Sequence, residues 1–154
     1  MKIAIGSDEA AFAFKEAMKS FLIEKGYKVI DKGVYDTTPV LYPDIAVKVS
    51  ESILKGEAER GALFCGTGIG MAITANKVPG IRAAVCHDSF SAERARKSND
   101  AQIICMGARV IGIELAKQLM SIWLESEFAG GGSTPKVEKI KEFEETGSHT
   151  FILG

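Results

Sequence analysis

The chain has 154 residues, of which 46% are hydrophobic and 25% charged, and its formal net charge is −1. This length and composition predict one globular domain with a core that needs no disulfide or metal. The near-zero charge provides no positive field for nucleic acid or an anionic membrane, and no apolar run approaches the roughly 18 residues of a membrane span.

The cysteines and histidines do not form a recognisable metal or redox pattern. Cys65, Cys86 and Cys105 show no C-x-x-C spacing, and the two histidines lie far apart in the sequence. The apolar start of the chain is interrupted by two acidic residues, which is unlike a signal peptide. We therefore expect a cytoplasmic protein with reduced cysteines, no metal and no cofactor.

Short apolar runs alternate with longer segments of helical periodicity. In chain order the sequence predicts a strand over Lys2–Gly6, a helix over 11–25, a strand over Tyr27–Asp31, a helix from Pro43 or Asp44 to Leu54, a strand over Gly61–Cys65, a helix ending at Lys77, a strand over Ile81–Cys86, a helix over Ser89–Lys97, a strand over Gln102–Met106, a helix over Gly112–Phe128 and a last helix over Val137–Glu145. Gly130–Gly132 are expected to form a hinge. We assign residues 1–145 to a single domain and residues 146–154 to a tail that is loose or bound by a partner.

This alternation, with nearly continuous apolar strands, predicts an α/β fold: a three-layer sandwich around a five-stranded parallel sheet, with an additional C-terminal helix. The expected strand order is 2-1-3-4-5. Ligands bind such sheets at the carboxyl ends of the strands, where the order reverses between strands one and three. The loop after strand one carries Ser7-Asp8-Glu9, and the loop after strand three carries Cys65-Gly66-Thr67-Gly68-Ile69-Gly70. Both loops are therefore predicted to face one crevice.

The second loop combines a nucleophile with potential anion donors. Cys65 precedes a helix N-terminus, where unpaired N–H groups and partial positive charge favour a thiolate. The glycines let backbone amides approach an anion, and Thr67 adds a hydroxyl donor. A base beside an oxyanion site is what proton abstraction next to a carbonyl requires, with Asp8 to orient substrate hydroxyls or move their protons. The alternatives are a buried structural cysteine, as we expect for Cys86 and Cys105, a nucleotide-binding turn, and a helix cap at Asp8.

Six segments carry a resemblance to a known family: Ile5–Asp8, Tyr42–Asp44, Cys65–Gly70, Ala75–Arg82, Ser98–Asp100 and Gly107–Gly112. The chain resembles the type B ribose-5-phosphate isomerases, which include the galactose-6-phosphate isomerase subunits. The resemblance implies a flavodoxin-like (Rossmann-type) fold and no metal. It also implies a homodimer or dimer of dimers whose active sites are shared between subunits.

The resemblance further implies an aldose–ketose isomerase of a phosphorylated sugar, with ribose 5-phosphate and ribulose 5-phosphate as the first candidate pair. Cys65 then moves a proton between C1 and C2, and Thr67 with the backbone of Gly66, Gly68, Ile69 and Gly70 stabilises the enediolate. Substrate contacts are assigned to Asp8, Glu9, Tyr42, Ser98 and Asn99, and phosphate contacts to Arg109 and Lys136.

Three positions depart from the family pattern. Glu9 stands where the family usually has a histidine, and Gly132 with Lys136 stand where it has two arginines, so one phosphate cation is lost. Ser98 replaces the histidine that opens the sugar ring, and serine is a poor general acid near neutrality.

The Ser98 substitution makes the substrate length an open question. A four-carbon 4-phosphate cannot close to a furanose through its blocked C4 oxygen, so it needs no ring opening. Erythrulose 4-phosphate and erythrose 4-phosphate therefore form a competing pair. A hexose phosphate is a further alternative substrate, and a non-catalytic protein that binds a sugar phosphate or a nucleotide is a further alternative function.

His87 is either a replacement for the lost histidine or a residue held by Asp88 or by backbone, while His149 in the tail is expected to be solvated. The broad apolar face of the 112–128 helix fits packing on the sheet or a subunit interface.

Overall fold

Strands and helices alternate along the chain, and the computed structural model describes residues 1–147. The elements are β1 (Lys2–Ser7), α1 (Phe12–Glu24), β2 (Lys28–Asp31), α2 (Tyr42–Leu54), β3 (Arg60–Cys65), α3 (Ile69–Asn76), β4 (Ala83–Val85), α4 (Ser89–Lys97), β5 (Ile103–Gly107), α5 (Ile113–Glu125), the 3-10 turn η1 (Gly131–Ser133) and α6 (Thr134–Thr146). Every predicted helix and strand is present, with ends that differ by a few residues.

The largest differences in element length have local causes. The fourth strand begins at Ala83 rather than at Ile81, and the N–H of the preceding Arg82 donates to the Gln102 side chain at 2.7 Å instead of to a backbone carbonyl. Helix α5 ends at Glu125 rather than at residue 128. Nη1 of the buried Arg60 accounts for this end, since it donates to the carbonyls of residues 123 and 124.

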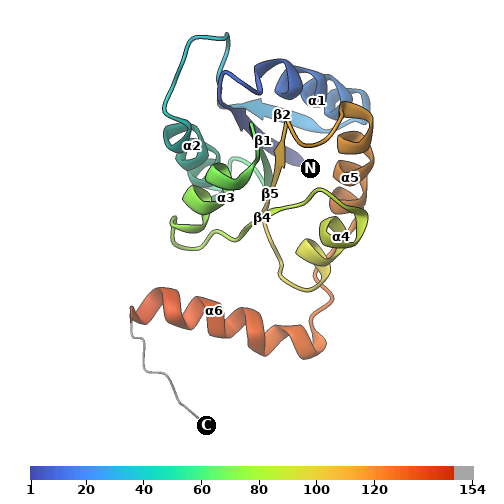
Figure 1. Cartoon of the computed structure of the whole chain (residues 1–154). Helices are drawn as coiled ribbons and strands as arrows, with labels where there is room; N and C mark the ends of the chain where they lie inside the picture. The colour runs from blue at the N-terminus through green and yellow to red at the C-terminus, as the bar shows by residue number, and fades with distance from the viewer. Residues whose placement is uncertain (148–154) are drawn as a thin grey trace.

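The five strands form one parallel sheet in the order β2-β1-β3-β5-β4, with helices on both faces (Figure 1). The predicted α/β sandwich is confirmed, but the last two strands are exchanged relative to the expected order 2-1-3-4-5. Burial explains the exchange. All five residues of β5 are buried, which suits an interior position beside β3, whereas the three residues of β4 are half-buried and suit an edge.

Two apolar cores lie on opposite faces of the sheet, because successive residues of a strand point to opposite sides. Ile3, Ile5, Phe64 and Met106 pack with α1, α4 and α5 in one core, whereas Ala4, Leu63 and Cys105 pack with α2 and α3 in the other. The same division is visible in Figure 1. The broad apolar face of α5 is used here for packing: Ala116, Leu119, Met120 and Trp123 are buried.

Helix α6 lies apart from the sandwich, below it in the view of Figure 1. Its contacts include a hydrogen bond from the Gly80 N–H to Glu144 Oε2 at 2.9 Å, and Val137 is its buried residue. Residues 148–154 of the predicted tail, including His149, lie outside the described residues. Within residues 1–147, no helix has both the length and the apolar character needed to cross a membrane.

Candidate active site

A crevice of about 430 Å³ opens at the carboxyl ends of β1 and β3, where the strand order reverses. Its lining consists of Asp8, Tyr42, Cys65, Gly66, Thr67, Ile69, Gly70, Ile73 and Arg109. The loops after β1 and β3 are brought together as predicted, and the Asp8 N–H donates to the Phe64 carbonyl at 3.2 Å. The crevice therefore gathers the three residues predicted to be catalytic and five of those predicted to bind substrate or phosphate.

Cys65 ends β3 with its sulfur held by the following turn. The side chain is 5% exposed, and Sγ accepts a hydrogen bond from the Gly68 N–H at 3.0 Å. Gly68 precedes α3 with φ +80°, and a Cβ on it would lie 2.9 Å from the Met106 carbonyl carbon. Both the left-handed conformation and the close approach require glycine here. The turn thus presents a thiol at the crevice with a backbone donor directed at its sulfur.

The remaining donors of the turn are divided between the protein itself and the crevice. The Ile69 N–H donates to Thr67 Oγ1 at 3.2 Å, so this amide, like that of Gly68, has an internal acceptor. Gly70, in the first turn of α3, has an N–H that a helix cannot satisfy internally. Thr67 is exposed, and its hydroxyl proton remains available for donation. The hydroxyl of Thr67 and the first-turn amide of Gly70 are the donors that an oxyanion can use.

Asp8 lies between the start of α1 and the crevice. Its Oδ1 accepts a hydrogen bond from the Ala11 N–H at 3.0 Å before α1, which corresponds to the capping interpretation, yet the residue also lines the crevice. Burial raises the pKa of the Asp8 carboxyl, the hydrogen bond from Ala11 opposes this, and the neighbouring Glu9 raises the pKa further. A carboxyl with a raised pKa holds a proton more readily than usual, and this suits a group that accepts and returns one.

Tyr42 lies against the start of α3. A Cβ on Gly70 would lie 2.5 Å from both Cζ and Oη of Tyr42, so the glycine leaves room for the phenol at the crevice. The loop that leads to Tyr42 is held by Glu9, whose Oε2 accepts a hydrogen bond from the Val40 N–H at 3.2 Å. Glu9 does not line the crevice. It fixes the loop on one side of the crevice, while its predicted contact with substrate stays a prediction.

Arg109 supplies the positive charge of the crevice. The residue follows β5, where its own N–H donates to the Gly66 carbonyl at 3.0 Å. Its guanidinium is exposed at the crevice and makes no ion pair or hydrogen bond with a side chain of residues 1–147. A planar cation without an internal partner is suited to bind a phosphate in a bidentate manner.

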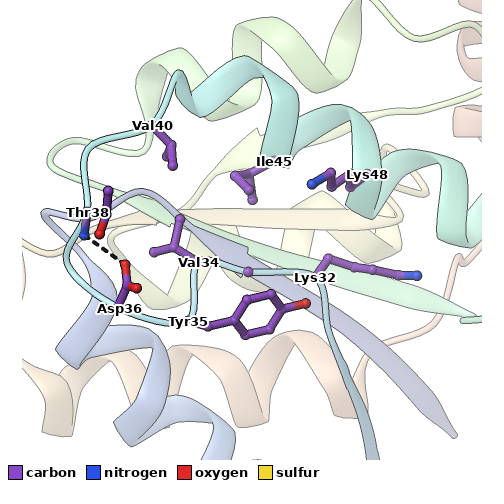
Figure 2. A pocket seen from close by; sticks show the side chains of 9 residues that line it. Lys32, Val34, Tyr35, Asp36, Thr38, Val40, Ile45 and Lys48 are labelled. Carbon is purple, nitrogen blue, oxygen red and sulfur yellow. Dashed lines mark hydrogen bonds between the residues drawn. The ribbon is translucent and has the colours of Figure 1, made fainter.

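A second hollow, of about 230 Å³, lies between the loop 32–40 and α2. Figure 2 shows the side chains of Val34, Val40 and Ile45 converging on it, with Lys32 and Lys48 at its side. Lys32 is paired with Glu57 at 3.1 Å. None of the residues predicted from the sequence to form the site lines this hollow.

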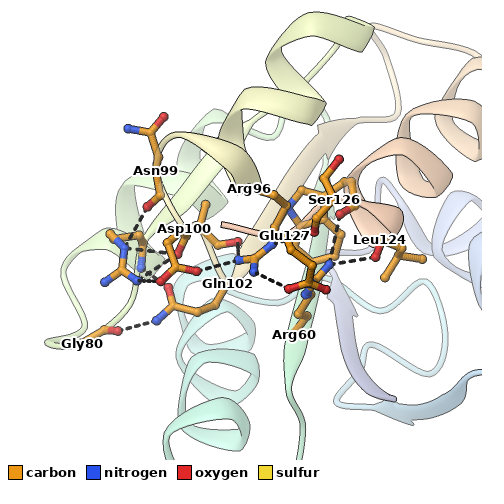
Figure 3. Close-up of polar contacts among 12 residues, drawn as sticks. Arg60, Gly80, Arg96, Asn99, Asp100, Gln102, Leu124, Ser126 and Glu127 are labelled. Atoms are coloured by element: carbon orange, nitrogen blue, oxygen red, sulfur yellow. Dashed lines mark hydrogen bonds and ion pairs between the residues drawn. The ribbon is translucent and has the colours of Figure 1, made fainter. Parts of the chain in front are cut away.

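Ser98, Asn99 and Lys136 do not line the crevice of their own chain. Helix α4 starts after the carboxyl end of β4 and runs back along the sheet. Residues at its C-terminal end therefore lie near the amino ends of the strands, away from the crevice. The hydrogen bond from Arg82 Nε, just before β4, to the Asn99 carbonyl at 3.0 Å confirms this location (Figure 3). Lys136 lies in the first turn of α6. These residues can reach a crevice only if that crevice belongs to another chain.

His87 lies after β4 and also does not line the crevice. Its Nε2 accepts a hydrogen bond from the Gly107 N–H at 2.8 Å, so backbone holds the imidazole, while Asp88 caps α4 by accepting from the Ser91 N–H. The ring-opening role of His87 stays a prediction.

Cys86 and Cys105 are fully buried, as expected for structural cysteines. Burial, with a smaller contribution from Asp88, raises the pKa of Cys86 to about 12, and burial also raises the pKa of Cys105. Within residues 1–147, no group of three or more His, Cys, Asp or Glu side chains is arranged to hold a metal ion.

Two residues near the crevice were missed by sequence reasoning. Ile73 lines it one helical turn after Ile69, a spacing that could have identified it. Gly107 supports the turn from below: a Cβ there would lie 2.7 Å from Thr67 Cα and 2.8 Å from the Gly66 oxygen. Gly107 begins the Gly107–Gly112 segment of the family resemblance, but that resemblance gave it no role.

Comparisons with known proteins agree with this geometry. The family model described as Ribose/Galactose Isomerase matches residues 3–140. A D-erythrulose-4-phosphate isomerase of Pectobacterium atrosepticum is 54% identical over 151 residues, covering 97% of this chain and 99% of that protein. A ribose-5-P isomerase B of Listeria innocua is 53% identical over 145 residues, covering 94% and 98%. The solved structure of Clostridium thermocellum ribose-5-phosphate isomerase B has a TM-score of 0.94 at 47% identity and covers 96% of this chain and 100% of that one. The chain therefore belongs to the ribose/galactose isomerase family and is a sugar phosphate isomerase.

Proposed function

We propose that the chain interconverts D-erythrulose 4-phosphate and D-erythrose 4-phosphate. The observation that carries this choice is Ser98, which stands at the position of the family's ring-opening histidine. His87 is the only histidine among the described residues, and its Nε2 lone pair is occupied by the Gly107 N–H. A substrate that needs no ring opening fits a site without an available imidazole. A relative 54% identical carries the name of this tetrose activity.

The reaction uses three groups of the crevice: Cys65 moves the carbon-bound proton, Asp8 moves the hydroxyl proton, and Thr67 with Gly70 stabilises the oxyanion. The Cys65 thiolate removes a proton from C1 of the ketose, the C–H electrons form the C1–C2 double bond, and the carbonyl electron pair moves onto the C2 oxygen. The Thr67 hydroxyl and the Gly70 amide stabilise that oxyanion. Asp8 transfers the hydroxyl proton from the C1 oxygen to the C2 oxygen, and the Cys65 thiol returns its proton to C2, which leaves the aldehyde at C1.

The phosphate and the remaining hydroxyls are bound by both faces of the crevice. Arg109 binds the phosphate from its own chain, and Tyr42 contacts a hydroxyl from its position on Gly70. Ser98, Asn99 and Lys136, at the other edge of the molecule, complete the crevice of a second copy in a homodimer or a dimer of dimers. A sedimentation measurement that finds only monomer at the concentration of the activity assay would exclude this arrangement.

Ribose 5-phosphate is the second candidate substrate. It is favoured by a relative 53% identical that is named a ribose-5-P isomerase B, and by the resemblance of the crevice residues to that family. For this substrate a group other than residue 98 has to open the ring.

Turnover of tetrose, pentose and hexose phosphates by the purified protein tests the proposal. The kcat/KM for erythrulose 4-phosphate is expected to exceed that for ribose 5-phosphate. The Ser98→His variant should raise kcat/KM for ribose 5-phosphate and should not raise kcat/KM for erythrulose 4-phosphate. A wild-type preference for ribose 5-phosphate would exclude the four-carbon assignment.

The role of Cys65 is tested separately by solvent deuterium exchange into the substrate. The Cys65→Ala variant is expected to lose about 10²-fold to 10⁴-fold in the rate of exchange at the substrate carbon, which is the usual contribution of a general base. Exchange at the wild-type rate in this variant would assign the base to another residue, and no exchange with any wild-type substrate would refute the isomerase mechanism.

A further inference from the structure

His87 occupies the point where pairing between β4 and β5 ends. The last paired residues are Val85 and Cys105, and the Cys86 N–H still donates to the Cys105 carbonyl at 3.1 Å. The Gly107 N–H, two residues further along β5, has no backbone acceptor from β4. It donates instead to His87 Nε2 at 2.8 Å, so the side chain replaces the missing backbone partner.

This hydrogen bond defines the chemical state of the ring. A nitrogen that accepts from an N–H carries no proton, so the imidazole is neutral with its hydrogen on Nδ1. Burial lowers the pKa of His87, against a smaller opposing effect from the negative Asp88, and this favours the same neutral form. The required property of residue 87 is therefore an acceptor at the position of Nε2.

Gly107 connects His87 to the catalytic turn. It is paired with Cys65 in the β3–β5 register, and its Cα is packed so tightly on Thr67 that a Cβ would lie 2.7 Å from the Thr67 backbone. The two residues that follow it tie down the same turn, because the N–H of Ala108 donates to the Cys65 carbonyl at 2.9 Å and that of Arg109 to the Gly66 carbonyl at 3.0 Å.

We propose that His87 is a positioning residue for the isomerisation, which through its hydrogen bond to Gly107 sets the place of the Cys65–Gly68 turn and of Arg109. The end of β5 has the edge strand β4 on one side and the catalytic turn on the other, so an unpaired Gly107 N–H releases the support of that turn. This role of His87 rests on the function proposed above, the isomerisation of a sugar phosphate. In it, His87 touches neither the substrate nor the reacting atoms.

Two amide substitutions at residue 87 test the position of the acceptor. The side-chain oxygen of glutamine can occupy the place of Nε2, whereas that of asparagine is one carbon shorter and cannot reach it. His87→Gln is expected to keep kcat within about threefold of wild type. His87→Asn is expected to lose about 10-fold to 100-fold in kcat with a smaller change in KM, as displaced catalytic groups do. Thermal melts of both variants establish that they are folded.

Three kinetic results would overturn the role of His87: full activity in both variants, equal loss in both while folded, or a loss confined to KM. Protection of the Gly107 amide from hydrogen exchange provides a second measurement that needs no substrate and no activity. Protection should be kept in wild type and His87→Gln and lost in His87→Asn, and equal protection in all three overturns the proposal. If wild type turns over no sugar phosphate, the proposed function fails, and this exchange experiment still decides whether His87 holds Gly107.

Discussion

Replacing Gly70 by alanine should separate the activity of this protein from its stability. The new Cβ would lie 2.5 Å from Cζ and Oη of Tyr42, whereas ordinary contacts of a Cβ begin near 3.4 Å. The phenol must therefore retreat by about 0.9 Å or rotate away, because the backbone of α3 is fixed and the side chain is not. Tyr42 is 39% exposed, so its movement into solvent meets little resistance.

Stability and activity are expected to respond differently to Gly70→Ala. Glycine inside a helix is about 0.5–1 kcal/mol less favourable than alanine, so Gly70→Ala should lose no stability beyond the packing of the phenol on α3. The melting temperature is expected to change by less than about 4 °C. A neutral hydrogen bond from Tyr42 to substrate contributes about 0.5–1.5 kcal/mol, and its loss corresponds to a reduction of about 2-fold to 12-fold in kcat/KM.

A double-mutant cycle with Tyr42→Phe measures whether the two residues act together. Each single variant should lower kcat/KM for the preferred sugar phosphate, and the double variant should lower it by no more than the larger single effect, since both changes remove one contact. If the two losses multiply, alanine at position 70 damages the crevice by another route. If Gly70→Ala retains wild-type kcat/KM, the phenol does not contact substrate from this position.

Three further predictions concern Gly107, His87 and the buried ion pair of Lys15. Gly107→Ala places a Cβ 2.7 Å from the Thr67 backbone and should cost about 1–3 kcal/mol of stability and on the order of 100-fold in kcat. The control Gly112→Ala, whose Cβ has nothing within 4 Å, should cost less than about 1 kcal/mol of stability. Thermal melts and turnover compare the two variants, and equal kcat values would contradict the packing argument. The pKa of His87 is lowered in the folded state, so the unfolded chain takes up this proton first as the pH falls. The stability from neutral His87 is therefore present above about pH 6.5 and is lost below it. In urea unfolding, the free energy of His87→Gln should depend less on pH than that of wild type between about pH 7.5 and 5, and an unchanged pH dependence would refute this. The fully buried Lys15 pairs with Asp31 at 2.8 Å. Lys15→Met should lower the free energy of unfolding, measured in urea, by about 3 kcal/mol, which is the low end for a broken buried pair because Lys19 still pairs with Asp31. A loss under about 1 kcal/mol would show that the pair is not needed.

The sequence was sufficient to predict the crevice because its two loops follow β1 and β3, whose adjacency is a general property of doubly wound sheets. Asp8 and Cys65 could be brought together by that rule alone. The exchange of β4 and β5 could not, because both apolar runs look alike in the sequence, and only the structure shows that β5 is fully buried whereas β4 is half-buried. Local pattern predicts elements, whereas the lateral order of strands depends on how the whole chain packs.

The roles assigned to Ser98 and Asn99 were predictable only as a family pattern, since no rule of sheet topology brings the end of α4 to the carboxyl edge. Arg109 was likewise assigned from the family pattern, and the position of β5 beside β3 in the structure accounts for its place in the crevice. The contact between Tyr42 and Gly70 could not be predicted at all. It joins the start of α2 to the start of α3, and the long loop before α2 is held by the hydrogen bond from the Val40 N–H to Glu9.

The turn after α4 is held by hydrogen bonds from two arginines. Asp100 adopts φ +49°, an unfavourable conformation for a residue with a side chain, although Asp tolerates it better than most. Arg96 Nη1 binds its carboxylate at 3.1 Å, and Arg82 Nη2 binds its carbonyl at 2.8 Å (Figure 3). The turn is thereby fixed with the side-chain amide of Asn99 directed away from this network. An outward side chain of Asn99 is what our proposal requires, since in it this residue completes the crevice of a second copy.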